Sequence, residues 1–306
     1  ISLGMGFAYG NGLSKHKERI FELLSDAALY PNFTQEELDK EKDKLITGLK
    51  SEENSPAAIA QRVTSILAYS KDHPYGEYVS EESVKNVSLK DIENNYKKMF
   101  NPNNAYMVVS GDVNVDEIKQ LVTKYFKNWK ISKKKLNQTI KNPVDVASTE
   151  INFVDMPDAV QSELSVLNIT DLQTNSEDHH AALVTNYILG GAFNSYLNMN
   201  LREENGWTYG ARSSIARNKW TNATFRATTS VRNAVTDSAV VETLKEINKI
   251  RDEFVNDDML ATAKAKYLGN FIMSTENKSL LADFAVNIKT LNLQDDFYET
   301  FIEKIN

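Results

Sequence analysis

The residues best suited to chemistry lie between positions 189 and 211, in the stretch LGGAFNSYLNMNLREENGWTYGA. Arg202 and Tyr209 stand seven positions apart, on either side of Gly206. An arginine offers a fixed fork of hydrogen-bond donors, and a tyrosine offers one rigid hydroxyl. Brought together across a turn, the two side chains suit a peptide carbonyl, or the oxyanion that this carbonyl becomes under attack.

Two kinds of element must position this pair: a helix that stops at Gly206, and a strand that follows it. Gly190 and Gly191 are predicted to break a preceding helix and to let two backbones approach closely. Asn194 is suited to cap the next helix. Gly206 occupies the position after a helix end, where the backbone adopts left-handed geometry.

Trp207 and Tyr209 are then expected to share one side of the following strand. A structural alternative for the same residues stays open. In that alternative Arg202 caps the helix end or pairs with Glu203 or Glu204, and Tyr209 fills the core. Composition and spacing alone favour the structural alternative.

Potential metal ligands are sparse. The chain has no cysteine, and its four histidines are His16, His73, His179 and His180. No two of them have the i, i+4 spacing that presents two imidazoles from one helix to a zinc ion. Adjacent residues on a helix point about 100° apart, so we expect one of His179 and His180 to be exposed and the other half-buried. His73 is expected to be a structural loop residue, and no metal ligand is predicted in this chain.

The bulk composition describes a globular protein with a core. The chain has 306 residues, 41% hydrophobic residues and a net charge of −7 from 42 acidic and 35 basic residues. The acidic balance argues against nucleic acid as the main partner. No apolar run reaches the length of a membrane span. The sequence begins with Ile and shows no signal-peptide pattern, so a signal peptide is neither indicated nor excluded.

Two α+β halves are predicted, at 1–135 and 136–306, joined by a lysine-rich segment at 130–148. The basic run at 127–135 is interpreted as part of this solvated linker. Apolar spacing and caps predict helices at 14–28, 31–49, 55–70, 88–100, 115–129, 176–189, 237–254 and 256–273. Alternating patterns predict strands, mostly antiparallel, at 2–10, 103–113, 149–157, 161–169, 207–216 and 222–232.

An internal similarity suggests duplication of one unit. Residues 35–56 resemble residues 257–279, because each stretch is a helix that begins with acidic or amide residues and runs into S-x-E-N. Self-similarity of this kind predicts two homologous domains in tandem. The second copy ends without a counterpart of the strand at 103–113, and the first copy lacks opening elements. We therefore expect both ends of the sequence to be truncated.

The stretch at 189–211 resembles the second domain of the M16 zinc peptidases, the family of insulysin, pitrilysin and the mitochondrial processing peptidase. In that family, a pattern L-G-G…L-R-E…G-x-x-Y-G carries an arginine and a tyrosine seven apart, which correspond here to Arg202 and Tyr209. LSDAALYPNFTQEELDKEKDKL, DHPYGEY and NPNNAYMVVSGDV in the first half fit the same family. The resemblance covers nearly the whole chain and implies two related α+β domains.

The resemblance breaks at the metal site. Family members that cut peptides carry H-x-x-E-H in the first domain and a third ligand, a glutamate, on a later helix; nothing here matches H-x-x-E-H. The register of the later glutamate falls near Gly48, which cannot bind metal, and Glu52 and Glu53 are poor substitutes. The resemblance therefore implies zinc in a partner chain or in a segment upstream of residue 1.

Three functions follow from this resemblance. The first is a subunit without zinc that supplies Arg202 and Tyr209 to a zinc-bearing M16 partner, or within a homo-oligomer, for hydrolysis of a peptide. The second is a zinc peptidase whose H-x-x-E-H lies upstream, which Gly48 disfavours. The third is a non-catalytic scaffold or peptide-binding subunit, like the M16-derived core proteins of respiratory complexes. Related bacterial two-chain members favour a periplasmic or cell-envelope location.

Overall fold

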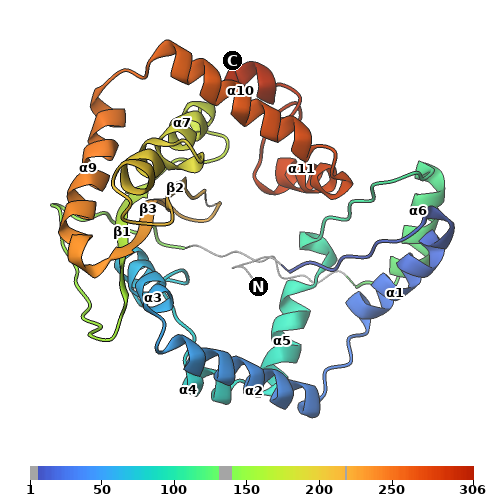
Figure 1. Cartoon of the computed structure of the whole chain (residues 1–306). Helices are drawn as coiled ribbons and strands as arrows, with labels where there is room; N and C mark the ends of the chain where they lie inside the picture. Colours follow the sequence, from blue (N-terminus) through green and yellow to red (C-terminus); the bar gives the residue numbers. More distant parts are fainter. Residues whose placement is uncertain (1–5, 131–139, 218) are drawn as a thin grey trace. The chain divides into compact units, whose positions relative to one another are not determined.

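The computed structural model describes residues 6–130, 140–217 and 219–306. The start of the predicted strand at 2–10 and most of the predicted linker lie outside these residues. The chain divides into two compact units (Figure 1). The first unit takes the described residues of 1–51, 79–138 and 277–286, and the second takes those of 52–78, 139–276 and 287–306. The division into 1–135 and 136–306 stays a prediction.

The first unit is helical. Its helices are α1 (Lys17–Leu29), α2 (Gln35–Glu52), α4 (Glu81–Asn86), α5 (Leu89–Met99) and α6 (Val115–Phe126), with short 3₁₀ turns η1 (Ser14–His16) and η2 (Pro102–Asn104). Polar caps fix several starts: the Ser88 hydroxyl accepts the Asp91 N–H, and the Asp91 side chain accepts the Ser88 N–H in return. This reciprocal arrangement satisfies two backbone donors that a helix start leaves unpaired.

The second unit is built from helices, short helical turns and the strands of a small sheet. They are α3 (Pro56–Tyr69), β1 (Gln161–Thr170), α7 (His179–Asn186), η3 (Tyr187–Gly191), α8 (Tyr196–Asn198), η4 (Met199–Glu204), β2 (Ala211–Ile215), β3 (Ala223–Arg232), η5 (Asn233–Val235), α9 (Thr236–Asp252), α10 (Asp257–Ser274) and α12 (Phe301–Ile305). The turns η3 and η4 are π-helical, and η5 is a 3₁₀ turn. Helix α11 (Lys278–Thr290) contributes residues to both units.

The described strands form one antiparallel sheet in the order β1-β3-β2. Strand β3 is central: it pairs with β1 from Gln161↔Arg232 to Thr170↔Ala223, and with β2 from Ala211↔Thr229 to Ile215↔Phe225. One face of the sheet packs into a buried cluster that joins it to the helices. This cluster contains Leu189, Leu197, Leu201, Ala211, Ala227, Val231 and Ala239.

A second cluster lies on the other side of the α7 segment. Val184 and Ile188 pack there against Leu268 of α10, and against Phe297 and Phe301 near the end of the chain. The segment from α7 through η3 is therefore held between two apolar clusters. Burial on both sides explains why this short run is helical despite its two glycines.

The predicted helices are confirmed to within a few residues at their ends. The predicted similarity of 35–56 and 257–279 corresponds to α2 and α10, each of which has 18 residues. Within the described ranges, no helix combines the length and the apolar character needed to cross a lipid bilayer.

Three predicted strands are corrected by the structure. The strands at 161–169 and 222–232 are confirmed as β1 and β3, and the strand at 207–216 is shortened to β2. In contrast, the described residues of 2–10, and those of 103–113 and 149–157, form no strand. An alternating sequence becomes a strand only where a neighbouring backbone completes its hydrogen bonds, and no described residue does this here. These strand-like segments remain exposed, with Tyr106 at 57%, Ile151 at 91% and Phe153 at 81% of full exposure.

Candidate functional site

Arg202 and Tyr209 both lie at the surface of the second unit, on one connected turn. Arg202 belongs to η4, and its side chain is 34% exposed. Tyr209 lies between Gly206 and β2 and is 92% exposed. In the described part of the chain, no hydrogen bond joins the two side chains and none occupies the phenol of Tyr209. The turn thus presents both donors to solvent.

The structural alternative, in which Arg202 pairs with a neighbouring glutamate and Tyr209 fills the core, is confirmed only for Arg202. Its Nη1 lies 3.3 Å from Oε1 of Glu203, as that alternative predicted. A surface ion pair of this kind contributes about 0–1 kcal/mol. It therefore does not prevent the guanidinium from making other contacts. The other half is wrong, because Tyr209 does not fill the core.

Phe193 is a partner of Arg202 that the sequence analysis missed. The guanidinium carbon of Arg202 lies 4.6 Å from the centroid of the Phe193 ring, which is itself 59% exposed. A guanidinium over an aromatic face is held by the ring quadrupole while its N–H edge stays free. The only sequence signal was an aromatic residue two positions after the glycine pair.

Gly206 behaves as predicted at the end of η4. Its φ is +63°, the left-handed geometry that favours glycine. The Gly206 N–H donates to the Arg202 carbonyl (3.1 Å), and the Trp207 N–H donates to the Leu201 carbonyl (3.0 Å). These bonds satisfy carbonyls that a helix end leaves open. The chain can therefore reverse direction immediately after Arg202.

The approach to β2 differs from the prediction. Trp207 and Tyr209 do not share one side, because Trp207 packs against the core cluster while Tyr209 is exposed. Hydrogen bonds with side-chain hydroxyls take the place of backbone pairing between strands here. The Gly210 N–H donates to the Thr208 hydroxyl (3.1 Å), and the Thr229 hydroxyl donates to the Gly210 carbonyl (3.1 Å). The strand therefore begins at Ala211 rather than at Trp207.

Asn198, not Asn194, anchors the start of this segment. Ser195 takes the cap position of α8, and its hydroxyl makes no hydrogen bond within the described residues. The fully buried Asn198 donates to the Phe193 carbonyl (2.7 Å) and accepts the Ala211 N–H (3.2 Å). One amide thus ties the loop that carries Phe193 to the start of β2. The prediction failed because a sequence shows local cap residues but not bonds across a turn.

Asn200 fixes the other end of the turn to α9. Its amide nitrogen lies 2.7 Å from Oε2 of Glu242 and 2.7 Å from Oε1 of Glu246. The Asn205 amide donates back to the carbonyl and to the side-chain oxygen of Asn200. The hydrogen bond from Asn200, followed by that from Lys245, holds the pKa of Glu242 below its ordinary value. Arg202 therefore projects from a turn whose buried side is held by the amides of Asn198 and Asn200.

The glycine pair acts mainly through Gly190. A Cβ at this position would lie 2.2 Å from the backbone nitrogen of Ser213. The predicted close approach of two backbones is therefore confirmed, between η3 and β2. Gly191 is the last residue of η3 and has more room, with its nearest neighbour 3.3 Å from an added Cβ.

The histidines make no metal site in the described part of the chain, where no three His, Cys, Asp or Glu side chains converge. His179 and His180 are both buried, at 1% and 8% exposure, so the expectation of one exposed ring is wrong. Their rings stack edge-to-face and pack against Phe297. Burial, followed by the charge of Arg217, lowers the pKa of His179 to about 4. The two rings serve the α7 core.

The other candidate ligands do not fit a zinc site either. His73 is buried in its loop, where its Nδ1 accepts the Tyr75 N–H at 3.0 Å and its ring stacks on Tyr69. Gly48 faces open space on α2, and Glu52 and Glu53 are exposed at the end of that helix. The donor set expected of an M16 zinc site is therefore not assembled by the residues described.

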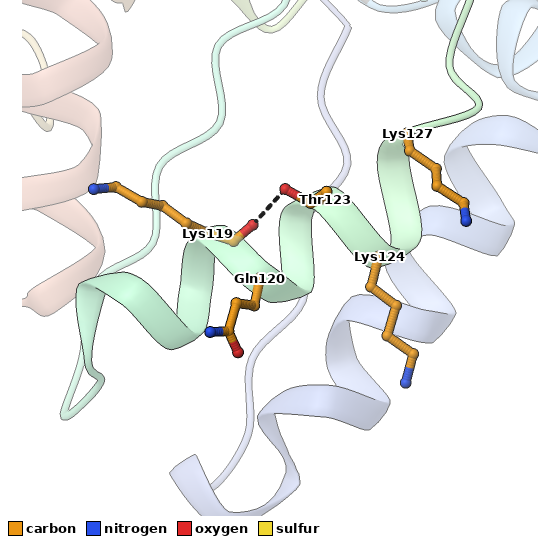
Figure 2. A pocket seen from close by; sticks show the side chains of 5 residues that line it. All are labelled: Lys119, Gln120, Thr123, Lys124 and Lys127. Carbon is orange, nitrogen blue, oxygen red and sulfur yellow. Dashed lines mark hydrogen bonds between the residues drawn. The ribbon is translucent and has the colours of Figure 1, made fainter.

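An open depression lies on α6. Figure 2 shows its lining by Lys119, Gln120, Thr123, Lys124 and Lys127. Lys119 points away from Lys124 and Lys127, and Lys124 pairs with Glu18 at 2.5 Å. No set of groups converges on one point, so this depression carries no chemistry.

A family model described as "Peptidase M16 inactive domain" matches residues 86–267, more than half of the chain. The non-peptidase homolog YmxG of Helicobacter pylori is 23% identical over 299 residues, which span 96% of this chain and 67% of that protein. The probable inactive metalloprotease YmfF of Bacillus subtilis is 26% identical over 147 residues, which span 47% of this chain and 34% of that protein.

A solved structure shows the same fold. The peptidase M16 inactive domain from Pseudomonas fluorescens superposes with a TM-score of 0.84 and 18% sequence identity. The superposition covers 95% of this chain and 69% of that one. The matched relatives are therefore longer than the sequence described here.

Proposed function

The chain belongs to the peptidase M16 family, and we propose that it is a component without its own metal site that supplies Arg202 and Tyr209 for peptide binding. The partner in this proposal is a second M16 subunit that carries zinc. The observation that carries the proposal is the exposure of both side chains on a turn whose buried side is held by Asn198 and Asn200.

The chemistry of the pair fits a carbonyl under attack. Arg202 offers several N–H donors, and the free phenol of Tyr209 offers one O–H donor. Donors fixed before the reaction bind an oxyanion more strongly than the neutral carbonyl from which it forms. Phe193 supports this role, because its ring leaves the guanidinium edge open while it limits the rotation of Arg202.

We also propose that the chain consists of two homologous domains in tandem. Two tandem homologous domains are supported by the equal length of α2 and α10 within stretches that resemble each other in sequence. In this arrangement Arg202 and Tyr209 belong to the second domain.

A second candidate function is peptide binding or scaffolding without any part in hydrolysis. It is supported by the descriptions of the relatives, one a non-peptidase homologue and one a probable inactive metalloprotease. Both candidates use the same exposed turn. They differ in whether an assembled complex hydrolyses peptides at a rate that depends on this chain.

The test is peptide hydrolysis by this chain together with a zinc-bearing M16 protein that co-purifies with it. Loss of one oxyanion donor typically lowers kcat by about 10²–10³, so Tyr209→Phe and Arg202→Ala are expected to do so in the assembled enzyme. Tyr30→Phe is the matched control, because Tyr30 is an exposed tyrosine of the other unit.

Three results would change the assignment. An unchanged rate for Tyr209→Phe and Arg202→Ala would exclude their role in hydrolysis. Peptide binding that depends on Arg202 without hydrolysis in any complex would favour the second candidate. Stoichiometric zinc in the purified chain would overturn the assignment of the metal to a partner.

A further inference from the structure

The face of the sheet opposite the core is polar. Successive residues of a strand point to opposite faces, so Ala227 and Val231 enter the core cluster while Thr224, Arg226 and Thr228 lie on the other face. Helix α3 contacts β1 and reaches this polar face. Its Gln61 accepts a hydrogen bond from Nη1 of Arg226 at 2.8 Å.

Arg226 is a half-buried cation without a counter-charge. It lies in the middle of the central strand, and its Nε is buried with no hydrogen-bond partner in the described part of the chain. No carboxylate pairs with it there, and the undescribed positions 1–5, 131–139 and 218 include no Asp or Glu. A buried charge is normally paired and hydrogen-bonded. Among the described residues, the guanidinium donates a hydrogen bond to the neutral amide of Gln61.

Two further polar side chains on the same face are those of Arg212 and Ser165. Arg212 of β2 is opposite Thr228, and Ser165 of β1 is opposite the same residue on the other side. Arg212 donates only to the neighbouring carbonyl of Ala211, and the buried hydroxyl of Ser165 has no hydrogen-bond partner among the described residues.

The register brings these groups within reach of one another. Arg226 is opposite Ser214 on β2 and Leu167 on β1. Arg212 and Ser165 are therefore its diagonal neighbours on either side. Diagonal positions across strands are about 7–8 Å apart, which long side chains can span. Two guanidinium groups and one hydroxyl thus flank Thr228 on a single sheet face.

We propose that this face, formed by Arg226, Arg212 and Ser165, is a binding site for a carboxylate. A carboxylate accepts two parallel hydrogen bonds from an arginine fork, so it would satisfy the orphaned Nε of Arg226 and balance its charge. The Ser165 hydroxyl supplies a further donor. The inference is independent of the Arg202–Tyr209 turn, because it uses neither residue and lies on a different part of the sheet.

The test is titration of the chain with sodium succinate at constant ionic strength, followed by calorimetry. A small, half-buried site of this kind is expected to bind with a dissociation constant on the order of 1 mM. Arg226→Gln is expected to weaken binding at least about tenfold, since it removes a charge-assisted hydrogen bond. Arg212→Gln is expected to weaken it about two- to fivefold.

Arg232→Gln is the matched control, because Arg232 is an exposed arginine at the end of the same strand and on the same face. It is expected to bind succinate as the unchanged chain does. Absence of saturable binding, unchanged binding by Arg226→Gln, or equal weakening in Arg232→Gln would each overturn the proposal.

A second measurement separates binding from a structural role. Without succinate, Arg226→Gln is expected to unfold at the same temperature as the unchanged chain or higher, because it removes an unpaired, half-buried charge. A lower unfolding temperature would show a structural arginine and contradict the proposal. A peptide with a free C-terminus, compared with its amidated form, then shows whether a peptide carboxylate competes with succinate.

Discussion

Two polar pairs lie along the same run of the second unit, from α7 to the start of β2, and they differ in almost every physical respect. His179 and His180 are buried at 1% and 8% exposure among aromatic rings. Arg202 and Tyr209 are 34% and 92% exposed on a turn. Both pairs consist of residue types that often carry chemistry, and only the second pair can meet a ligand.

The difference shows that environment decides what such residues do. The imidazoles are kept neutral by burial and by the positive charge of Arg217 and Lys304, which disfavours a second positive charge nearby. Neutral and enclosed rings of this kind behave as packing groups. Arg202 and Tyr209 instead lie on a turn that neighbouring buried side chains hold in place. These buried neighbours are the support of the pair, and they leave its own donors available.

The largest expected effect is the loss of stability when a buried residue of the support, rather than a residue of the exposed pair, is truncated. Leu201 is fully buried directly before Arg202, so Leu201→Ala is expected to lower the free energy of unfolding by about 2–5 kcal/mol. Tyr209→Phe, at an exposed position, is expected to change it by less than about 0.5 kcal/mol. Urea unfolding of both variants measures this contrast. Equal losses would show that Tyr209 is part of the support.

The second prediction concerns the pH dependence of the buried pair. The folded pKa of His179 is about 4, below the ordinary value of 6.5. Between these values the unfolded chain binds a proton that the folded chain excludes, so stability falls as the pH drops from 6.5 to 4. The loss contributed by His179 approaches about 3 kcal/mol at the lower end. Above pH 6.5 the ring is neutral in both states and contributes no slope.

Unfolding at several pH values measures this loss. His179→Gln is expected to remove the part of the slope that His179 contributes, while His180, whose pKa burial also lowers, keeps its own part. His16→Gln, at an exposed histidine, is expected to leave the slope unchanged. An unchanged slope in His179→Gln would assign the pH dependence to other groups.

The smallest expected effect tests the ring beside Arg202. Under the proposed function, Phe193→Leu keeps apolar bulk but removes the aromatic face, and is expected to weaken peptide binding by about 0.5–1 kcal/mol. Phe193→Tyr keeps the face and is expected to bind as the unchanged chain does. Fluorescence anisotropy with a labelled peptide measures both. If Phe193→Leu binds the peptide as tightly as the unchanged chain does, the aromatic ring of Phe193 does not contribute to binding.

Local features were largely predictable from the sequence. Helix α2 follows from its cap residue Thr34, whose hydroxyl accepts the Glu37 N–H, and β1 and β3 follow from their alternation. The left-handed Gly206 and the close approach at Gly190 were also foreseen. Each of these depends on neighbours within a few positions, or on the absence of a side chain.

Features that depend on distant parts of the chain were not predictable. The bonds from Asn200 reach Glu242 and Glu246, more than forty positions away. The contact between Phe193 and Arg202 depends on how a loop folds back over η4. The prediction of strands at 103–113 and 149–157 failed for a related reason, since alternation records the preference of a segment but not whether another strand lies beside it.

The exposed strand-like segments have a practical consequence for handling the chain in solution. Around Ile151 and Phe153, exposed apolar side chains alternate with polar ones in a segment that forms no strand. Such a segment is a template for pairing with a copy of itself. Self-association should therefore grow with protein concentration, and the net charge of −7 opposes it less as salt is added. Dilute, low-salt buffers should limit this self-association most.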